Sequence, residues 1–255
     1  MSPSSNRLHL LYHELRNSPS DYSYVVERDE FERHADFFVQ ARRHGAPLFW
    51  PEITFDDGHI SNYELALPAL ASRGLQATFF ITGGWTGTRS GYMGWEELRA
   101  LHAGGQRIGA HGWTHTLLTH CTDEALKTEL GSARLHLEDK LGTAITAMSL
   151  PGGRFDRRVL AACREAGYTQ VYSSIPRLEQ ATQELVGRLN VRNGQSVEWF
   201  AQLLDPSSGL LAKLERQDRW KAALKKMMGD RTYAKLWAVL NRQETNSDPI
   251  ETSIR

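Results

Sequence analysis

Short apolar runs alternate with helical patterns along most of this chain, and this alternation limits its fold more than any other feature. Seven runs predict strands, and six stretches between or after them predict helices. The strands are expected at 8–12, 48–55, 77–81, 106–110, 145–150, 170–173 and 189–191, and the helices at 28–44, 62–72, 95–103, 122–141, 156–166 and 196–204. Because strands and helices that alternate with short connections are typical of parallel sheets, we expect an α/β fold with a parallel sheet, open or closed into a barrel.

Composition limits the domain count and the partners. A chain of 255 residues can bury one large core, and it fits one α/β domain better than two small ones. Thirty Lys and Arg residues balance thirty Asp and Glu residues, so the overall charge does not indicate nucleic acid. Cys121 and Cys163 cannot build a disulfide framework, which suits a reducing compartment. The apolar stretch at 8–12 is too short for a signal peptide or a membrane span, so we expect a cytoplasmic protein.

The pattern changes after residue 205, where the predicted domain (1–205) ends. Residues 206–242 are expected to form a basic helical extension with one apolar side, and residues 243–255 to form a disordered tail. One interpretation packs the extension over the domain with its Lys and Arg side chains in solvent. The other places it against a partner or against an anionic lipid surface, which would give the protein a peripheral membrane contact.

Two adjacent carboxylates, Asp56 and Asp57, follow the apolar run that ends at Phe55. Like charges this close repel each other, and burial removes their hydration, so a compensating cation is expected. Helix capping by Asp57 is the structural alternative. Capping needs only one carboxylate, and it does not explain Gly58, whose access to positive φ permits a sharp turn at the end of the strand.

Two histidines, His111 and His115, follow another predicted strand. Their spacing of four residues puts both imidazoles on one side of a helical turn, and a tight loop can bring them together as well. One carboxylate with two imidazoles leaves coordination positions for water, which is the composition of a catalytic zinc-type site. The second carboxylate could then accept a proton from that water. A third motif, 151–154, follows the fifth strand, so three polar motifs should meet at one edge of the sheet.

The two segments 54–58 (Thr-Phe-Asp-Asp-Gly) and 111–115 (His-Gly-Trp-Thr-His) resemble the first two motifs of the polysaccharide deacetylases, the NodB-homology group related to carbohydrate esterase family 4. The resemblance covers about residues 8–204. It implies a distorted (β/α) barrel of about seven parallel strands, to which the C-terminal helices are added. It also implies that Asp57, His111 and His115 hold a divalent metal, Zn²⁺ or else Co²⁺, Ni²⁺ or Mn²⁺, with Asp56 as the general base.

The same resemblance suggests residues that bind the substrate. Tyr12 and His13 resemble a Tyr-His pair that often ends the first strand in this family, and the other substrate-binding candidates are Trp113, Pro151, Gly152 and Arg154. The third motif departs from the family pattern, because it has neither the usual arginine nor the usual aromatic residue around its proline. Arg154 or Arg188 could supply the missing positive charge.

A proton donor for the leaving amine is not evident. The histidine that serves this role in the family has no counterpart in residues 188–193, and the nearest candidates by sequence are His13, His59 and His120. The resemblance predicts a metal-dependent hydrolase that removes N-acetyl groups from a saccharide, in a role that would suit exopolysaccharide synthesis inside the cell. Two alternatives stay open: hydrolysis of another non-peptide C–N bond, in a cyclic amide or ureide, and carbohydrate binding without turnover.

Overall fold

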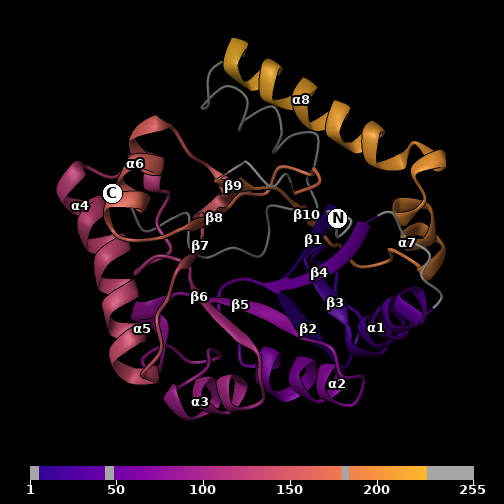
Figure 1. Ribbon diagram of the computed structural model, residues 1–255, viewed down its shortest axis with the longest axis horizontal. Coiled ribbons are helices and arrows are strands. Elements are labelled where there is room, and N and C mark those ends of the chain that lie inside the picture. The colour runs from indigo at the N-terminus through magenta and orange to yellow at the C-terminus, as the bar shows by residue number, and fades with distance from the viewer. Residues whose placement is uncertain (1–5, 44–48, 180–183, 229–255) are drawn as a thin grey trace, which may run out of the picture.

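A parallel β-sheet forms the centre of the computed structural model, which describes residues 6–43, 49–179 and 184–228 (Figure 1). Its strand order in this part of the chain is β10-β1-β4-β5-β6-β7-β8-β9, and every pairing is parallel. The strands are β1 (Asn6–Tyr12), β4 (Phe49–Phe55), β5 (Ala77–Ile81), β6 (Arg107–Ala110), β7 (Ala147–Ser149), β8 (Gln170–Tyr172), β9 (Leu185–Val186) and β10 (Arg188–Asn190).

A single residue, Gly187, separates the two strands at the ends of this order. β9 pairs with β8 through Val186 and Tyr172, and β10 pairs with β1 through Arg188 and His9, so one bent segment links both ends of the sheet. A side chain at Gly187 would collide with the Ile175 carbonyl and the Arg177 side chain, which explains why glycine occupies the bend. Counting this segment as one strand, the sheet becomes a barrel of seven strands, and the predicted distorted (β/α) barrel is confirmed.

Helices surround the outside of this barrel (Figure 1). They are α1 (Arg28–Arg43), α2 (Leu67–Ala71), α3 (Trp95–Ala103), α4 (Asp123–Lys127), α5 (Ala133–Leu141), α6 (Arg157–Glu165), α7 (Val197–Leu204) and α8 (Leu210–Met228), with π-helical turns η1 (Asn62–Ala66) and η4 (Thr128–Ser132) and 3-10 turns η2 (Gly83–Trp85), η3 (Leu118–His120), η5 (Pro151–Gly153) and η6 (Pro206–Ser208). The predicted helix at 62–72 therefore begins with a wider π turn, and the one at 122–141 is interrupted by such a turn. A second parallel pair, β2 (Glu14–Arg16) and β3 (Val25–Glu27), was not predicted.

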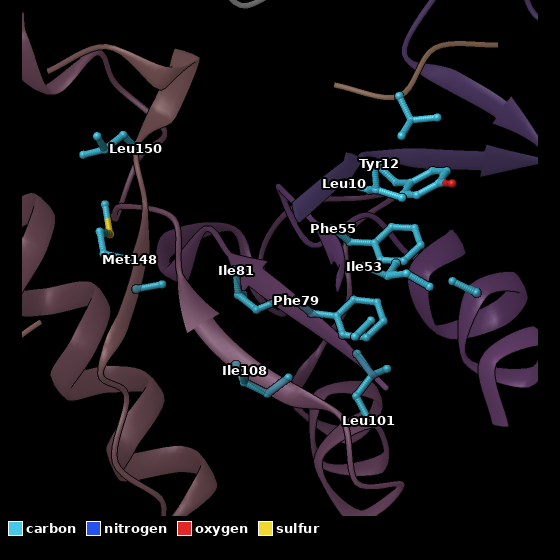
Figure 2. Close-up of a cluster of buried hydrophobic side chains, with 14 of the residues drawn as sticks. Leu10, Tyr12, Ile53, Phe55, Phe79, Ile81, Leu101, Ile108, Met148 and Leu150 are labelled. Carbon is cyan, nitrogen blue, oxygen red and sulfur yellow. The ribbon is translucent and has the colours of Figure 1, made fainter. Parts of the chain in front are cut away.

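The main apolar core lies between the barrel and its helices. The rings of Tyr12, Phe55 and Phe79 follow one another across β1, β4 and β5 (Figure 2), with Phe55 and Phe79 stacked at 5.0 Å between centroids. Phe31 of α1 packs edge-on against Tyr12 and Phe55. Phe55 faces the helices, and neighbouring residues of a strand point to opposite faces. Thr54 therefore points to the inside of the barrel.

The inside of the barrel holds a smaller aromatic layer. Phe80 and Tyr172 pack together with Val186, and their ring centroids are 4.9 Å apart. Gly109 of β6 pairs with Phe80 of β5, and a Cβ at Gly109 would lie 2.5 Å from the Phe80 ring. The absence of a side chain at Gly109 therefore makes room for this ring inside the barrel.

The C-terminal helix α8 lies at the edge of the molecule (Figure 1). Leu210, Leu211 and Leu214 at its beginning pack against the core, whereas the side chain of Trp220 is 72 % exposed. None of the described helices is both long and apolar enough to cross a membrane. The remainder of the predicted extension, from residue 229, and the predicted tail at 243–255 lie outside the described residues.

Candidate metal centre and substrate cleft

The motif residues meet at one end of the barrel because they follow strands that run in the same direction. Asp56 and Asp57 follow β4, His111 follows β6, and Ser149 ends β7. Arg188 begins β10, and its side chain is fully buried. Carboxyl ends of parallel strands are where catalytic groups collect in barrels of this kind.

A sharp turn after β4 sends the two carboxylates in different directions. Asp57 has a φ of 73°, in the left-handed region, and Gly58 follows at 86°. A non-glycine residue in this region costs of order 1–3 kcal/mol, and such residues cluster at functional sites. The turn directs Asp57 toward the histidines and Asp56 toward Arg188.

Three ligand-type atoms converge at the end of the barrel: Asp57 Oδ1, His111 Nε2 and His115 Nε2. Asp57 Oδ1 lies 3.3 Å from the His111 nitrogen and 3.2 Å from the His115 nitrogen. His111 Nδ1 donates to the Ser149 carbonyl at 2.8 Å, so the neutral ring presents its Nε2 lone pair to Asp57. Among the described residues, Asp57 Oδ1 is buried and has no hydrogen-bond partner. Lone pairs that face one another this closely require a cation or a proton between them.

The spacing fits a divalent cation. Zinc–ligand distances of about 2.0–2.2 Å imply ligand atoms roughly 3.3 Å apart in a tetrahedral site, and the two distances at Asp57 agree with this value. Burial lowers the pKa of His111, but Asp56 and Asp57 raise it by a larger amount, so positive charge is favoured at this point. Asp57, His111 and His115 can therefore hold a divalent metal.

A buried glutamate fixes the loop that carries the histidines. The Glu129 carboxylate accepts hydrogen bonds from the backbone N–H of Trp113 and Thr114, at 2.8 and 2.9 Å, and from the Thr114 hydroxyl at 2.6 Å. These bonds hold a loop in which His115 has a φ of 65°, another left-handed residue. Glu129 lies in the π turn η4, and no local pattern in the sequence indicated its role.

Asp56 is held by a buried arginine and a serine. Its two oxygens accept hydrogen bonds from Arg188 Nη1 and Nη2 at 2.7 and 2.8 Å, and the Ser149 hydroxyl donates to Oδ2 at 2.8 Å. Arg188 also donates to the Ser149 hydroxyl and the Ser173 carbonyl, and it packs over the Phe80 ring. Burial raises the pKa of Asp56, but the Arg188 guanidinium and its hydrogen bonds outweigh this effect and hold the pKa below its usual value.

Arg188 thus provides the positive charge that the third motif lacks. The sequence left open whether Arg154 or Arg188 would do so, and it is Arg188 that contacts Asp56. The available signal in the sequence was the position of Arg188, a single arginine in the mostly apolar segment that ends at Val191.

The candidate metal ligands Asp57, His111 and His115 lie in a cleft of about 600 Å³. Predicted site residues that line this cleft are Asp56, Asp57, His111, His115, His13 and Gly152. Its other walls include the aromatic and charged side chains of Glu14, Arg16, Tyr22, Tyr24, His59, Trp85, Arg89 and Tyr92.

Four predicted substrate-binding residues do not line the cleft: Tyr12, Trp113, Pro151 and Arg154. Tyr12 points to the helix side of β1, where its hydroxyl donates to His34 Nδ1 at 3.2 Å. Trp113 lies against the backbone of Gly83 and packs on the His136 ring. Pro151 is a buried residue of the 3-10 turn η5, which follows β7. The structure does not bring these four side chains to the lining of the cleft, because proximity along the chain does not determine the face to which a side chain points.

Comparison with known proteins agrees with this geometry. Residues 52–171 match the polysaccharide deacetylase family. These residues therefore carry a polysaccharide deacetylase domain.

Two curated relatives show how far the similarity extends. YxkH of Bacillus subtilis is 26 % identical over 155 residues, which are 60 % of this chain and 55 % of the relative. Chitin deacetylase 1 of Cryptococcus neoformans is 30 % identical over 119 residues, 47 % of this chain and 24 % of the relative. The chain therefore spans about half the length of the first relative and a quarter of the second.

Solved structures share the fold of this polysaccharide deacetylase domain. The Streptococcus pyogenes deacetylase PplD, in complex with acetate, superposes with a TM-score of 0.71 at 18 % identity, over 79 % of this chain and 99 % of that chain. IcaB from Ammonifex degensii gives a TM-score of 0.66 at 23 % identity, over 78 % and 96 % of the two chains. At these identities the likeness establishes the fold alone.

Proposed function

We propose that this protein is a metal-dependent hydrolase that removes N-acetyl groups from a saccharide. The observation that carries the proposal is the convergence of Asp57, His111 and His115 beside a second buried carboxylate, Asp56, in one cleft. Family membership supports a hydrolase that acts on carbon–nitrogen bonds.

The residues present have distinct roles in this reaction. A divalent metal held by Asp57, His111 and His115, Zn²⁺ or else Co²⁺, Ni²⁺ or Mn²⁺, would supply an activated water and polarise the acetamide carbonyl. Asp56 Oδ2 lies 3.8 Å from His111 Nε2, close enough to accept the proton of a water at this point. Arg188 keeps Asp56 ionised, and so able to accept that proton, at neutral pH.

His13 is the proton donor that we assign to the leaving amine. Of the three candidates, His13 and His59 line the cleft and His120 does not. His59 Nδ1 is engaged with the Ser61 hydroxyl at 2.8 Å, whereas His13 Nδ1 is buried and has no hydrogen-bond partner among the described residues. Burial lowers the pKa of His13, and the nearby Asp57 carboxylate opposes this shift. An imidazole in this position can deliver a proton to a nitrogen bound in the cleft.

Acetate release and metal content, measured together, test the proposal. The wild-type chain should release acetate from N-acetylglucosamine oligomers, and Asp57→Ala or His111→Ala should lose bound metal and activity together. His13→Ala should retain the metal but lose activity by about 100-fold or more, whereas the matched control His120→Ala should keep both. Deacetylation that persists after complete removal of the metal would reject the scheme.

The same assay separates the two alternatives. Ring opening of small cyclic amides without acetate release from any saccharide would favour hydrolysis of another C–N bond. Saccharide affinity without turnover under several divalent metals would favour a binding protein. An exopolysaccharide substrate and a cytoplasmic location stay predictions.

A lipid surface is the partner that we propose for α8. The helix carries six Lys or Arg residues against Glu215 and Asp218, and it exposes Trp220 and Leu224. Basic side chains next to exposed apolar ones favour contact with anionic headgroups. Vesicle flotation, described with the other predictions below, tests this contact.

A further inference from the structure

One wall of the cleft carries an arginine stacked on two aromatic rings. The Arg89 guanidinium carbon lies 4.0 Å from the centroid of the Trp85 ring and 4.8 Å from that of the Tyr92 ring. The two rings are themselves in edge contact, with centroids 4.6 Å apart. All three side chains line the cleft.

Backbone hydrogen bonds hold this loop in place. Arg89 N–H donates to the Trp85 carbonyl at 3.0 Å, and Tyr92 N–H donates to the Arg89 carbonyl at 3.3 Å. Ile60 N–H donates to the Gly91 carbonyl at 2.8 Å, which ties the loop to the segment after the Asp-Asp turn. Stacking and this tie fix the guanidinium before any ligand arrives, so little conformational entropy is lost when it binds one.

Among the residues that the structure describes, none uses the hydrogen-bonding capacity of the Arg89 guanidinium. Over residues 6–43, 49–179 and 184–228, no side chain or carbonyl accepts a hydrogen bond from its guanidinium, and no carboxylate forms an ion pair with it. Arg16, the other arginine that lines the cleft, is paired with Glu14. The N–H groups of a guanidinium point outward in its own plane. A guanidinium that is stacked through its faces can therefore still bind an anion at its edges.

The position of Arg89 relates it to the metal centre. The Trp85 ring that it covers lies 5.1 Å from the ring of His115, one of the three candidate metal ligands. The Trp85 ring therefore lies between Arg89 and the metal centre. This separation suits a group on the sugar next to the one that is deacetylated, and not the acetamide itself.

We propose that Arg89 binds a carboxylate of the saccharide, so that the preferred substrate is acidic, with a uronic acid next to the N-acetylated sugar. Two parallel N–H groups of the planar guanidinium can donate to the two oxygens of a carboxylate. The inference rests on the proposed function, because it places an N-acetylated sugar at the metal centre.

Binding of matched oligosaccharides tests this inference independently of turnover. The full chain is titrated calorimetrically, with a chelator present, using a tetrasaccharide that alternates N-acetylglucosamine and glucuronate. The comparison ligand is the same tetrasaccharide with its carboxyl groups reduced to alcohols. Wild-type protein should bind the acidic form about tenfold more tightly, the factor expected for a partly exposed charged hydrogen bond, and added salt should narrow the difference.

Variants then assign the effect to one residue. Arg89→Gln should remove the preference for the acidic form and leave affinity for the reduced form unchanged. Arg89→Lys, which keeps the charge but loses the fork, should retain part of the preference. The matched control Arg16→Gln, at the arginine already paired with Glu14, should change affinity by about twofold at most. Equal loss for both ligands, or an equal effect of the Arg16 substitution, would overturn the assignment.

Failure of this inference and failure of the proposed function give different results. If no saccharide releases acetate from the metal-loaded protein but the Arg89-dependent affinity persists, the deacetylation is wrong and the carboxylate site stands. If acetate is released equally fast from acidic and reduced tetrasaccharides in both wild type and Arg89→Gln, the carboxylate site is wrong and the deacetylation stands. A phosphorylated sugar that depends on Arg89 when the uronate does not would also overturn the carboxylate assignment.

Discussion

Replacing Arg188 by methionine would leave the Asp56 carboxylate buried without its counter-ion. Arg188 has no exposed surface, and both of its terminal nitrogens bond to Asp56, at 2.7 and 2.8 Å. Methionine fills much of the volume of the arginine stem but carries no charge. Removing one member of a buried ion pair costs about 3–5 kcal/mol, against a total stability of about 5–15 kcal/mol for a typical domain. We therefore expect Arg188→Met to lower the melting temperature by roughly 6–20 °C.

The loss of stability should depend on pH in a defined direction. In the wild type, the folded pKa of Asp56 lies below its usual value because Arg188 outweighs the effect of burial. Asp56 therefore stabilises the fold above about pH 4, and this contribution is lost as the pH falls through the folded pKa. Without Arg188, burial raises the folded pKa above the unfolded one, so the ionised carboxylate opposes folding at neutral pH. The difference between the two proteins should be largest near pH 7 and should shrink toward pH 4.

Urea unfolding at several pH values, with a chelator present, measures this difference. The double variant Arg188→Met with Asp56→Asn supplies the control, because it removes the unpaired charge as well. We expect the double variant to be more stable than the sum of the two single losses predicts. A loss below about 1 kcal/mol, a loss that does not change with pH, or strict additivity of the two substitutions would refute the reasoning.

Two further substitutions test the packing inside the barrel and the surface of α8. Gly109→Ala should cost about 1–3 kcal/mol in thermal unfolding, because its Cβ would lie 2.5 Å from Phe80, whereas Gly131→Ala has open space and should be neutral or stabilising by up to about 1 kcal/mol. The protein should float with phosphatidylserine vesicles and not with neutral ones, and Trp220→Ser should reduce this binding. Substitution of Leu135, a 66 % exposed residue on α5, by serine is the matched control, and flotation unaffected by Trp220→Ser would contradict a role for this residue.

Much of the element order follows from local pattern. β5 and α3 begin and end at the predicted residues, because a β-prone run of four apolar residues and one threonine and a helical period bounded by glycine are both short-range signals. β2, β3 and β9, which have two or three residues each, were missed. The bend at Gly187 that closes the barrel could not be read either, because it is defined by pairing with two strands far away in the sequence.

By itself, the sequence pattern determined an α/β fold with a parallel sheet, and the resemblance to the polysaccharide deacetylases added the barrel. The pattern also indicated that Asp56, Asp57, His111 and His115 meet at the ends of strands, because each motif is a few residues long and follows a recognisable strand. Only the tertiary structure decided that Arg188, 132 residues away in the chain, pairs with Asp56 and that Arg89 is stacked in the cleft wall. Element type depends on short-range sterics and hydrogen bonding. Which buried charges meet depends on how the strands are paired around the barrel, and that is a property of the whole fold.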